Sequence, residues 1–162
     1  MTANPVFHIA WESNDEVSIN DFLENRPSNN ICILAHHAVM SSNQVSMAAR
    51  KARYNFEQGL NRARELDTEF IRILAGTHNI SLAFNRVGLK SSCRKGWLVN
   101  LADDGQNLIE FADSLGLKSA GNEYEITGEN LRKLGIEFSD KVSPEKYQDM
   151  LLGHIAGSDL DY

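Results

Sequence analysis

The sequence predicts an α/β domain of the α+β kind, in which a small mixed or antiparallel sheet packs against several helices. Its 162 residues match the length of one domain, and a hydrophobic share of 42% with a charged share of 23% is typical of globular proteins. Apolar runs of strand length are intermixed with segments of helical periodicity, and no repeat of roughly 20–50 residues occurs. We therefore expect a single domain over residues 1–162, with residues 157–162 as a loose acidic tail.

The N-terminal part is expected to form two strands and a short helix. Residues 5–11 have strand composition, and residues 18–25 can form a helix that ends before Pro27. Residues 31–40 (ICILAHHAVM) are a nearly continuous apolar run of strand length. A strand that is apolar on both faces belongs inside a sheet.

The middle of the chain is expected to begin with two helices. Residues 42 to about 64 carry apolar side chains at helical spacing, which predicts a long amphipathic helix. Asp67 or Thr68 can cap a second helix, and Gly76 is suited to the left-handed conformation that ends it.

A third helix follows directly, so that two helices meet at a tight corner over residues 76–79. Thr77 or Asn79 can cap this helix, and Gly88 closes it. Its predicted apolar face carries Ile80, Ala83, Phe84 and Val87.

Residues 96–102 (GWLVNLA) are predicted to form a further strand, and residues 123–127 are also strand-like. Between them, Asp103 and Asp104 form the cap region of a helix that ends at Gly116.

Two more helices complete the predicted domain. Thr127 begins a short one that ends at Gly135, and the last helix has Ser143 as its cap and Pro144 at its first position. One face of the last helix carries Tyr147, Met150, Leu151, His154 and Ile155.

The net charge of −6 argues against non-specific nucleic-acid binding, but charge is unevenly distributed along the chain. Residues 1–49 carry −4 and residues 96–162 carry −8, whereas residues 50–95 hold ten basic and four acidic side chains, a net +6. The basic residues of this central block are Arg50, Lys51, Arg53, Arg62, Arg64, Arg72, Arg86, Lys90, Arg94 and Lys95. They could contact phosphates, or they could be ordinary solvated helix faces.

The sequence contains no run of roughly 18 apolar residues and no signal-peptide pattern, so we expect a cytoplasmic protein without membrane contact. Its two cysteines, Cys32 and Cys93, are too few for a zinc site or a disulfide scaffold. We expect neither a metal nor a cofactor.

The usual sequence signatures of catalysis are missing: the chain has no GxxxxGK[ST], GxGxxG, GxSxG, HExxH or CxxC. The adjacent histidines His36 and His37 fall in a predicted strand, where neighbouring side chains point to opposite faces and cannot easily share a metal. The prediction is no catalytic residue. The alternative is a small-molecule enzyme that uses His36, His37 or His78 with a nearby carboxylate.

Residues 73–88 read ILAGTHNISLAFNRVG, and here the chain resembles the kinase-binding subunit of the KEOPS complex, the PRPK-binding protein family of archaea and eukaryotes. The shared residues are Leu74, Asn79, Ile80, Ser81, Ala83 and Gly88. The order of the predicted elements also fits this family along nearly the whole chain.

The resemblance implies a non-enzymatic protein that binds the N-lobe of a small PRPK-type kinase. The complex, which includes a carbamoyltransferase, makes threonylcarbamoyladenosine on tRNAs that read codons beginning with A. Archaeal relatives are also implicated in binding the single-stranded 3′ CCA end of tRNA.

This resemblance gives the central basic block a role in tRNA contact. The corner at residues 76–79 opens a helix, where unpaired backbone N–H groups and the positive dipole end favour an anion, and His78 could stack on a base. Alternatively, Thr77 or Asn79 merely caps the helix. The residues expected to bind tRNA are Arg50, Arg53, Arg62, Arg64, Arg72, Gly76, Thr77, His78, Asn79, Arg86, Lys90, Arg94 and Lys95.

The last helix is the expected contact with the kinase, through Tyr147, Met150, Leu151, His154 and Ile155. The alternative is that this apolar stripe packs entirely into the core. An enzyme should show a concave cavity with convergent titratable groups, whereas a binding subunit should show an exposed apolar helix face and a separate basic surface.

Overall fold

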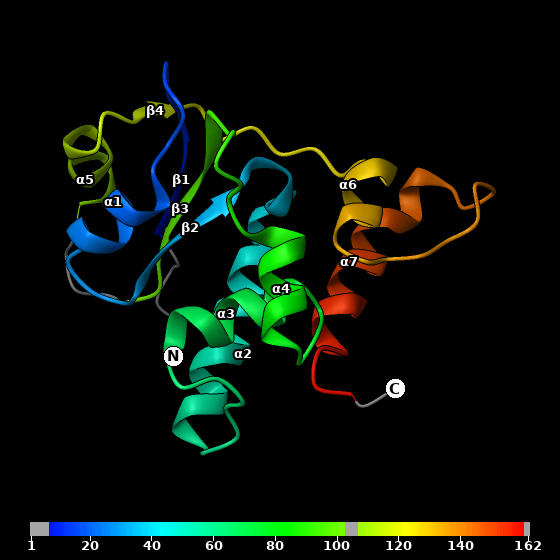
Figure 1. The fold of residues 1–162 in the computed structure, drawn as a ribbon. Coiled ribbons are helices and arrows are strands. Elements are labelled where there is room, and N and C mark those ends of the chain that lie inside the picture. The colour runs from blue at the N-terminus through cyan, green and yellow to red at the C-terminus, as the bar shows by residue number, and fades with distance from the viewer. Residues whose placement is uncertain (1–6, 103–106, 161–162) are drawn as a thin grey trace.

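Four antiparallel strands form the central sheet, in the order β2-β3-β1-β4 (Figure 1). The computed structural model describes residues 7–102 and 107–160. The strands are β1 Phe7–Glu12, β2 Ile31–Ala35, β3 Lys95–Asn100 and β4 Lys118–Ala120. In β3, Trp97 pairs with Leu34 on one side and Ala10 on the other. The predicted fold class is confirmed, and the sheet is of the antiparallel kind.

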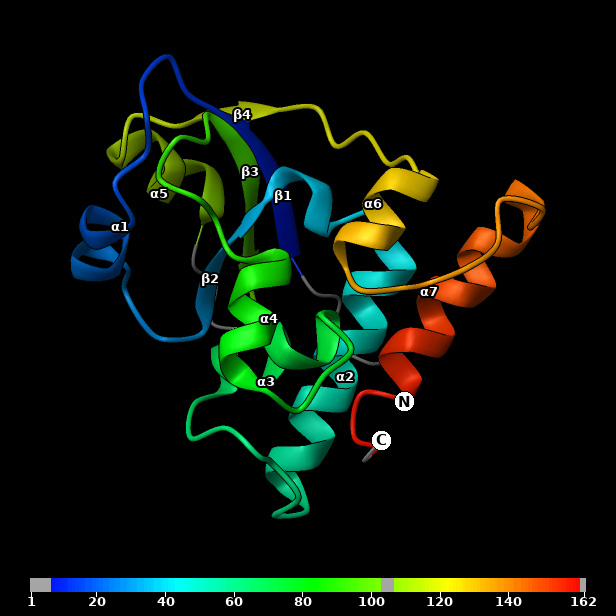
Figure 2. The same cartoon turned by 45° about the vertical axis from the view of Figure 1, so that its right-hand side comes forward.

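Helices cover both faces of this sheet. They are α1 Ile19–Asn25, α2 Ser42–Glu57, α3 Leu66–Leu74, α4 Ile80–Val87, α5 Leu108–Ser114, α6 Gly128–Lys133 and α7 Tyr147–Ala156, with 3₁₀ turns η1 His36–Ala38 and η2 Pro144–Lys146. α1 and α5 lie on one side of the sheet and the other helices on the opposite side (Figure 1 and Figure 2). Side chains alternate between the two: Ile31 and Ile33 pack towards α1 and α5, and Cys32 and Leu34 towards the larger group. β2 is apolar throughout because both of its faces are covered.

The strand predicted at residues 31–40 is shorter than expected, because the chain turns into η1 after β2. The carbonyl of His36 accepts a hydrogen bond from the indole nitrogen of Trp97 at 3.0 Å, and the buried amide of Gln44 donates to the carbonyl of Ala38 at 2.8 Å. Ala38 of this turn and the following Val39 and Met40 are buried, so the apolar composition of β2 continues past the end of the strand.

α2 also ends earlier than the predicted residue 64. Gly59 has a φ of +69°, a conformation that ends the helical path. Beyond it, the backbone N–H groups of Arg62 and Ala63 each donate to the carboxylate of Glu69 at 3.0 Å. The loop therefore folds around Glu69, which a continued helix would prevent.

Most of the other predicted boundaries are confirmed. The predicted caps that accept a backbone N–H are Asn79, Thr127 and Ser143. The predicted helix-ending glycines with positive φ are Gly76, Gly116 and Gly135. These positions follow from local chemistry, because a cap or a left-handed glycine needs only its own neighbours in the chain.

The predicted cap of α3 is wrong. The N-cap residue is Glu65, without a side-chain hydrogen bond, and both Asp67 and Thr68 lie inside the first turn. Asp67 instead pairs with Arg26 at 2.7 Å, which joins α3 to the end of α1. The carboxylate that was expected to cap the helix is thus used in a tertiary ion pair.

The C-terminal half differs from the prediction in three places. Residues 123–127 do not form a strand, and β4 pairs with β1 instead. The N-cap of α5 is Asn107, while the predicted cap region 103–104 lies outside the described residues. Residues 157–160 of the expected loose tail fold back on α2 and α3, where Asp159 forms ion pairs.

Candidate functional site

Two helix C-termini converge where α3, α6 and α7 meet. The carbonyl oxygens of Ala75, at the end of α3, and Leu134, at the end of α6, both lie 2.9 Å from Nε2 of His154. Because a carbonyl only accepts, this nitrogen carries the proton and donates to both. Nη1 of Arg86 donates to the carbonyl of Ala75 as well, at 2.9 Å. These donors complement the negatively polarised ends of the two helices.

Glycine is required directly after each of these helix ends. Gly76 has a φ of +71° and Gly135 a φ of +86°. A Cβ atom on Gly76 would lie 2.1 Å from Nε2 of His154, and one on Gly135 would lie 2.3 Å from Cζ of Arg86. His154 and Arg86 can approach the carbonyls because the backbone there carries no side chain.

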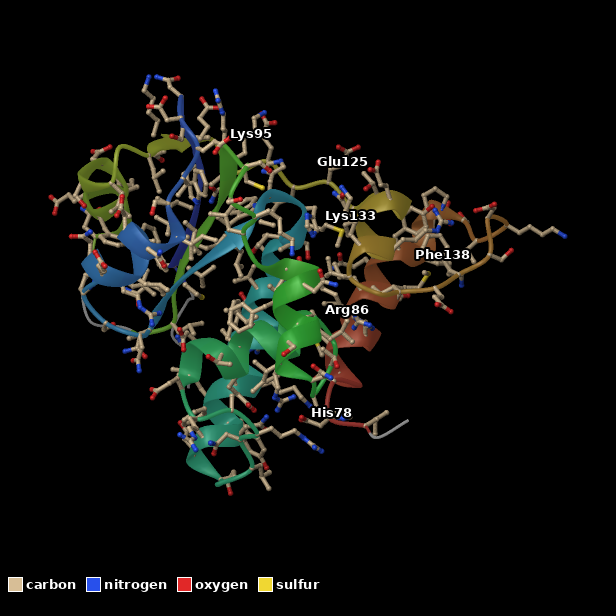
Figure 3. The ribbon with its side chains drawn as sticks, viewed as in Figure 1. His78, Arg86, Lys95, Glu125, Lys133 and Phe138 are labelled. Atoms are coloured by element: carbon tan, nitrogen blue, oxygen red, sulfur yellow. The ribbon has the colours of Figure 1, made fainter. Side chains whose placement is uncertain are left out.

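A cavity of about 410 Å³ lies against this junction. Its lining residues are Gly76, Thr77, His78, Arg86, Gly135, Gly153, His154, Gly157 and Leu160. The glycines leave backbone groups accessible. Among the described residues, the ionisable side chains of this lining are one arginine and two histidines, and the lining includes no carboxylate. Figure 3 shows His78 in the corner before α4 and Arg86 on α4, both on the side of the C-terminal segment. The cavity therefore favours a polar or anionic ligand.

The corner before α4 is fixed by its own hydrogen bonds. Oδ1 of Asn79 accepts from the backbone N–H of Leu82 at 3.0 Å, and the hydroxyl of Thr77 accepts from the N–H of Asn79 at 3.1 Å. His78, between them in sequence, is exposed. The capping interpretation of Asn79 is confirmed, and His78 is the exposed ring of the corner.

The residues predicted to bind tRNA do not lie on one surface. Gly76, Thr77, His78 and Arg86 come together in the cavity. The side chains that are exposed but do not line it belong to Arg50, Arg62, Arg64, Asn79, Lys90, Arg94 and Lys95. Arg53 is half-buried, and its guanidinium donates to the carbonyl of Leu101 at 2.9 Å. The sequence block is thus divided by the fold into a cavity group and scattered surface cations.

Arg72 is a correction to the predicted surface, because its side chain is fully buried. Its guanidinium pairs with Glu69 at 2.5 Å and with Asp159 at 2.8 Å. α3 is buried on most sides, so a basic residue within it is buried too. In this conformation Arg72 cannot contact tRNA.

The histidines of the alternative enzyme hypothesis occupy different surroundings. His36 and His37 form η1 and not the predicted strand. The His36 ring stacks on Trp97 with centroids 6.5 Å apart, and Nε2 of His37 donates to the carbonyl of Arg86 at 2.6 Å. Burial lowers the pKa of His37, which favours the neutral ring that makes this bond. In the two described ranges, no group of three or more His, Cys, Asp or Glu side chains could hold a metal ion.

An apolar groove of about 540 Å³ between α1 and α4 was not predicted. Its apolar lining includes Ile19, Phe22, Leu23, Ile33, Ile71, Phe84 and Leu89. Leu23 is 49% exposed and Phe84 44%, and Ile80, one turn before Phe84, is 37% exposed. Of the predicted apolar face of α4, only Ala83 and Val87 are buried. Ile80 and Phe84 are apolar residues of this face that the core does not bury. Such surplus apolar residues on one helix are the feature of the sequence that could have indicated the groove.

The stripe on α7 largely faces the core. Leu151 and Ile155 are fully buried, and Tyr147 and Met150 are partly buried against the same cluster. Core packing, the alternative considered for this stripe, accounts for Leu151 and Ile155. A contribution of Tyr147, Met150 and His154 to kinase docking stays a prediction.

The fold and these surfaces are typical of a small α/β binding protein, with a polar cavity on one side and an apolar groove on another. The chain matches the family described as kinase binding protein CGI-121 over residues 13–146. Because the match covers most of the chain, the protein belongs to the CGI-121 family, and the resemblance seen around α4 is confirmed. No curated protein matches the chain. None of the helices in the described ranges is long and apolar enough to cross a membrane.

Proposed function

We propose that this protein is a non-catalytic subunit of the KEOPS complex, which makes threonylcarbamoyladenosine on tRNA in the cytoplasm. Family membership supports a kinase as its direct partner. In this proposal the partner is the small PRPK-type kinase, and the carbamoyltransferase is reached indirectly through it. The protein contributes binding surfaces and no catalytic group.

The groove between α1 and α4 is the proposed principal kinase contact. Contiguous apolar surface on a monomer commonly marks a protein interface. Phe84 and Leu23 stand at the edge of an otherwise buried apolar floor, and an aromatic side chain at such a place is a typical anchor of binding energy. Tyr147, Met150 and His154 of α7 are proposed as a secondary contact.

The cavity beside α4 is the proposed site for the single-stranded 3′ CCA end of tRNA. The observation that supports it is the joint placement of His78, Arg86 and glycine backbone around a hollow whose described lining includes no carboxylate. Single-stranded RNA is held by phosphate contacts and by bases stacked on planar side chains. Arg86 supplies a charged donor, His78 supplies a ring, and the glycines allow the chain of the RNA to approach.

The exposed cations outside the cavity are proposed to contact the tRNA backbone further from its end. Apart from Arg62, whose guanidinium pairs with Asp159, they are Arg50, Arg64, Lys90, Arg94 and Lys95. Such contacts add affinity without sequence preference and weaken as salt is raised.

The test of this function is a pull-down with the tagged full chain from its native cell extract. Recovery of a small kinase together with a carbamoyltransferase, and of tRNA, supports the proposal. Recovery of the kinase without tRNA would remove the RNA part. Recovery of none of these would contradict the KEOPS assignment.

A further inference from the structure

Three cations from the central basic block converge on one carboxylate of the C-terminal segment. Asp159 lies 2.8 Å from Nη2 of Arg72, 3.2 Å from Nζ of Lys51 and 3.5 Å from Nε of Arg62. Lys51 belongs to α2, Arg72 to α3, and Arg62 to the loop that joins them. Parts of the chain that are separate in sequence thus form one cationic cluster around Asp159.

Arg72, the buried residue of this group, does not use all of its hydrogen-bond donors within the described residues. Arg72 is fully buried and pairs with Glu69, but its Nη1 makes no hydrogen bond within the described residues. Asp159 is 32% exposed and covers Arg72 from the solvent side. Two carboxylates therefore face three cations here, and the outer carboxylate is the one that can leave.

The same segment forms part of the wall of the proposed RNA cavity. Gly157 and Leu160, on either side of Asp159, both line it. Figure 1 and Figure 2 show the chain after α7 turning back beside the connection between α3 and α4. Movement of residues 157–160 would open the cavity and expose the three cations together.

We propose that residues 157–160 are a built-in competitor for RNA, in which the Asp159 carboxylate occupies the position of a backbone phosphate on Lys51, Arg62 and Arg72. Carboxylates and phosphates both accept paired hydrogen bonds from arginine, and a phosphate can use the same donors. An RNA phosphate that displaces the segment pairs with Lys51, Arg62 and Arg72, but the ion pairs of Asp159 with these residues must break first. The affinity measured for the full chain is therefore reduced by the fraction of molecules in the closed state. This inference rests on the proposed tRNA function.

The test compares wild type, Asp159→Asn and a chain that ends at Ala156 in binding a labelled single-stranded RNA that ends in CCA, over a series of salt concentrations. Both variants should bind several-fold more tightly than wild type. The log–log salt slope should stay nearly the same, because wild type, once its segment is displaced, neutralises the same phosphates. Asp149→Asn on α7 removes the same charge at an exposed position and should change neither quantity. Arg62→Gln should cost more affinity in the Asp159→Asn background than in wild type, because the guanidinium no longer pairs with the Asp159 carboxylate there.

A second measurement uses the unaltered protein and does not depend on how the variants fold. The backbone N–H groups of Ser158 and Leu160 donate to Ile155 and Gly157, so hydrogen exchange reports whether this segment is in place. RNA should accelerate exchange at residues 157–160, although binding normally slows exchange at a contact surface. If wild type binds RNA but exchange there is unchanged or slower, the competitor inference is overturned while the tRNA function stands. If neither wild type nor any variant binds RNA, the proposed tRNA function fails, and this inference with it.

Discussion

Nε2 of His154 lies 2.9 Å from the carbonyl oxygen of Ala75, and this bond joins the last helix of the chain to the end of α3. The same nitrogen also reaches Leu134, so α3, α6 and α7 are held at one point. Leu151 and Ile155 pack α7 into the core beside it. The wall of the proposed RNA cavity and the attachment of α7 therefore depend on the same imidazole.

Gly76→Ala should destabilise the protein by about 3 kcal/mol or more. The left-handed conformation costs an L side chain roughly 1–2 kcal/mol, and the new Cβ would also displace His154 from Ala75. Denaturant unfolding measures the loss. Gly116→Ala is the matched control, because Gly116 has a φ of +76° but nothing within 4 Å of its Cβ position. It should lose only the conformational part, about 1 kcal/mol, and equal losses at the two positions would contradict the predicted steric role of His154.

Stability should fall as the pH decreases from about 7 to 5. The pKa of His154 is lowered from 6.5 chiefly by burial, against the two carbonyl hydrogen bonds that raise it, and the charge of Arg86 lowers it further. Below the unfolded pKa the unfolded chain binds the proton more readily than the folded chain, so the folded state loses stability. His37, whose pKa burial also lowers, adds to the effect. The double variant His154→Gln, His37→Gln should show a flatter dependence in this range, and an unchanged slope would rule out these histidines as its source.

A second loss of stability should occur at more acidic pH, through Glu69. Burial by itself would raise its pKa, but hydrogen bonds from Arg72, Asn55 and the N–H of Ala63 outweigh burial and lower it. The stabilisation is present above the unfolded value, near 4.5, and disappears as the pH falls through the lower folded value. Glu69→Gln should cost about 3–5 kcal/mol near pH 7 and reduce the stability lost on acidification. Glu57→Gln, exposed at the end of α2, should change stability by less than about 0.5 kcal/mol.

Kinase docking should be more sensitive to the α4 groove than to α7. Phe84→Asp replaces a 44% exposed ring, so the free protein should stay folded while its affinity for the kinase falls at least about 30-fold, about 2 kcal/mol. Met150→Asp should lower both stability and affinity, because Met150 is partly buried against the core. Leu151→Ala is the control for core packing alone, with a loss of about 2–5 kcal/mol in unfolding and none in docking by the folded protein. Thermal unfolding and titration with purified kinase separate these cases. Unchanged affinity for Phe84→Asp would rule out the groove.

The parts of the fold that depend on neighbouring residues could be predicted from the sequence. Asn79 caps α4 and Gly135 ends α6 for reasons of local hydrogen bonding and φ. The parts that depend on tertiary contacts could not. The indole of Trp97 donates to the carbonyl of His36 where β2 ends, and Glu69 accepts from the loop after α2. Nothing in either local sequence indicates these contacts.

The local part of the candidate site could likewise be predicted from the sequence, and its tertiary part could not. The corner around His78 was expected from the motif, but its meeting with Gly135 and His154 arises only when α6 and α7 pack beside α3. Its positive charge gave no indication that Arg72 is buried, because the other basic residues of the same block are mostly exposed. Its spacing from Glu69, three residues earlier on the same helix, was the one sequence indication of an ion pair.

The most direct test of the central claim is the affinity of the full chain for intact tRNA and for the same tRNA without its CCA end. Intact tRNA should bind more tightly, and His78→Ala should remove most of the difference, since a lost base stack costs roughly 1–3 kcal/mol, or about 5- to 150-fold. His36→Ala, an exposed histidine outside the cavity, is the matched control and should leave both affinities unchanged. Equal binding of intact and trimmed tRNA by the wild-type protein would contradict the assignment of this cavity to the tRNA end.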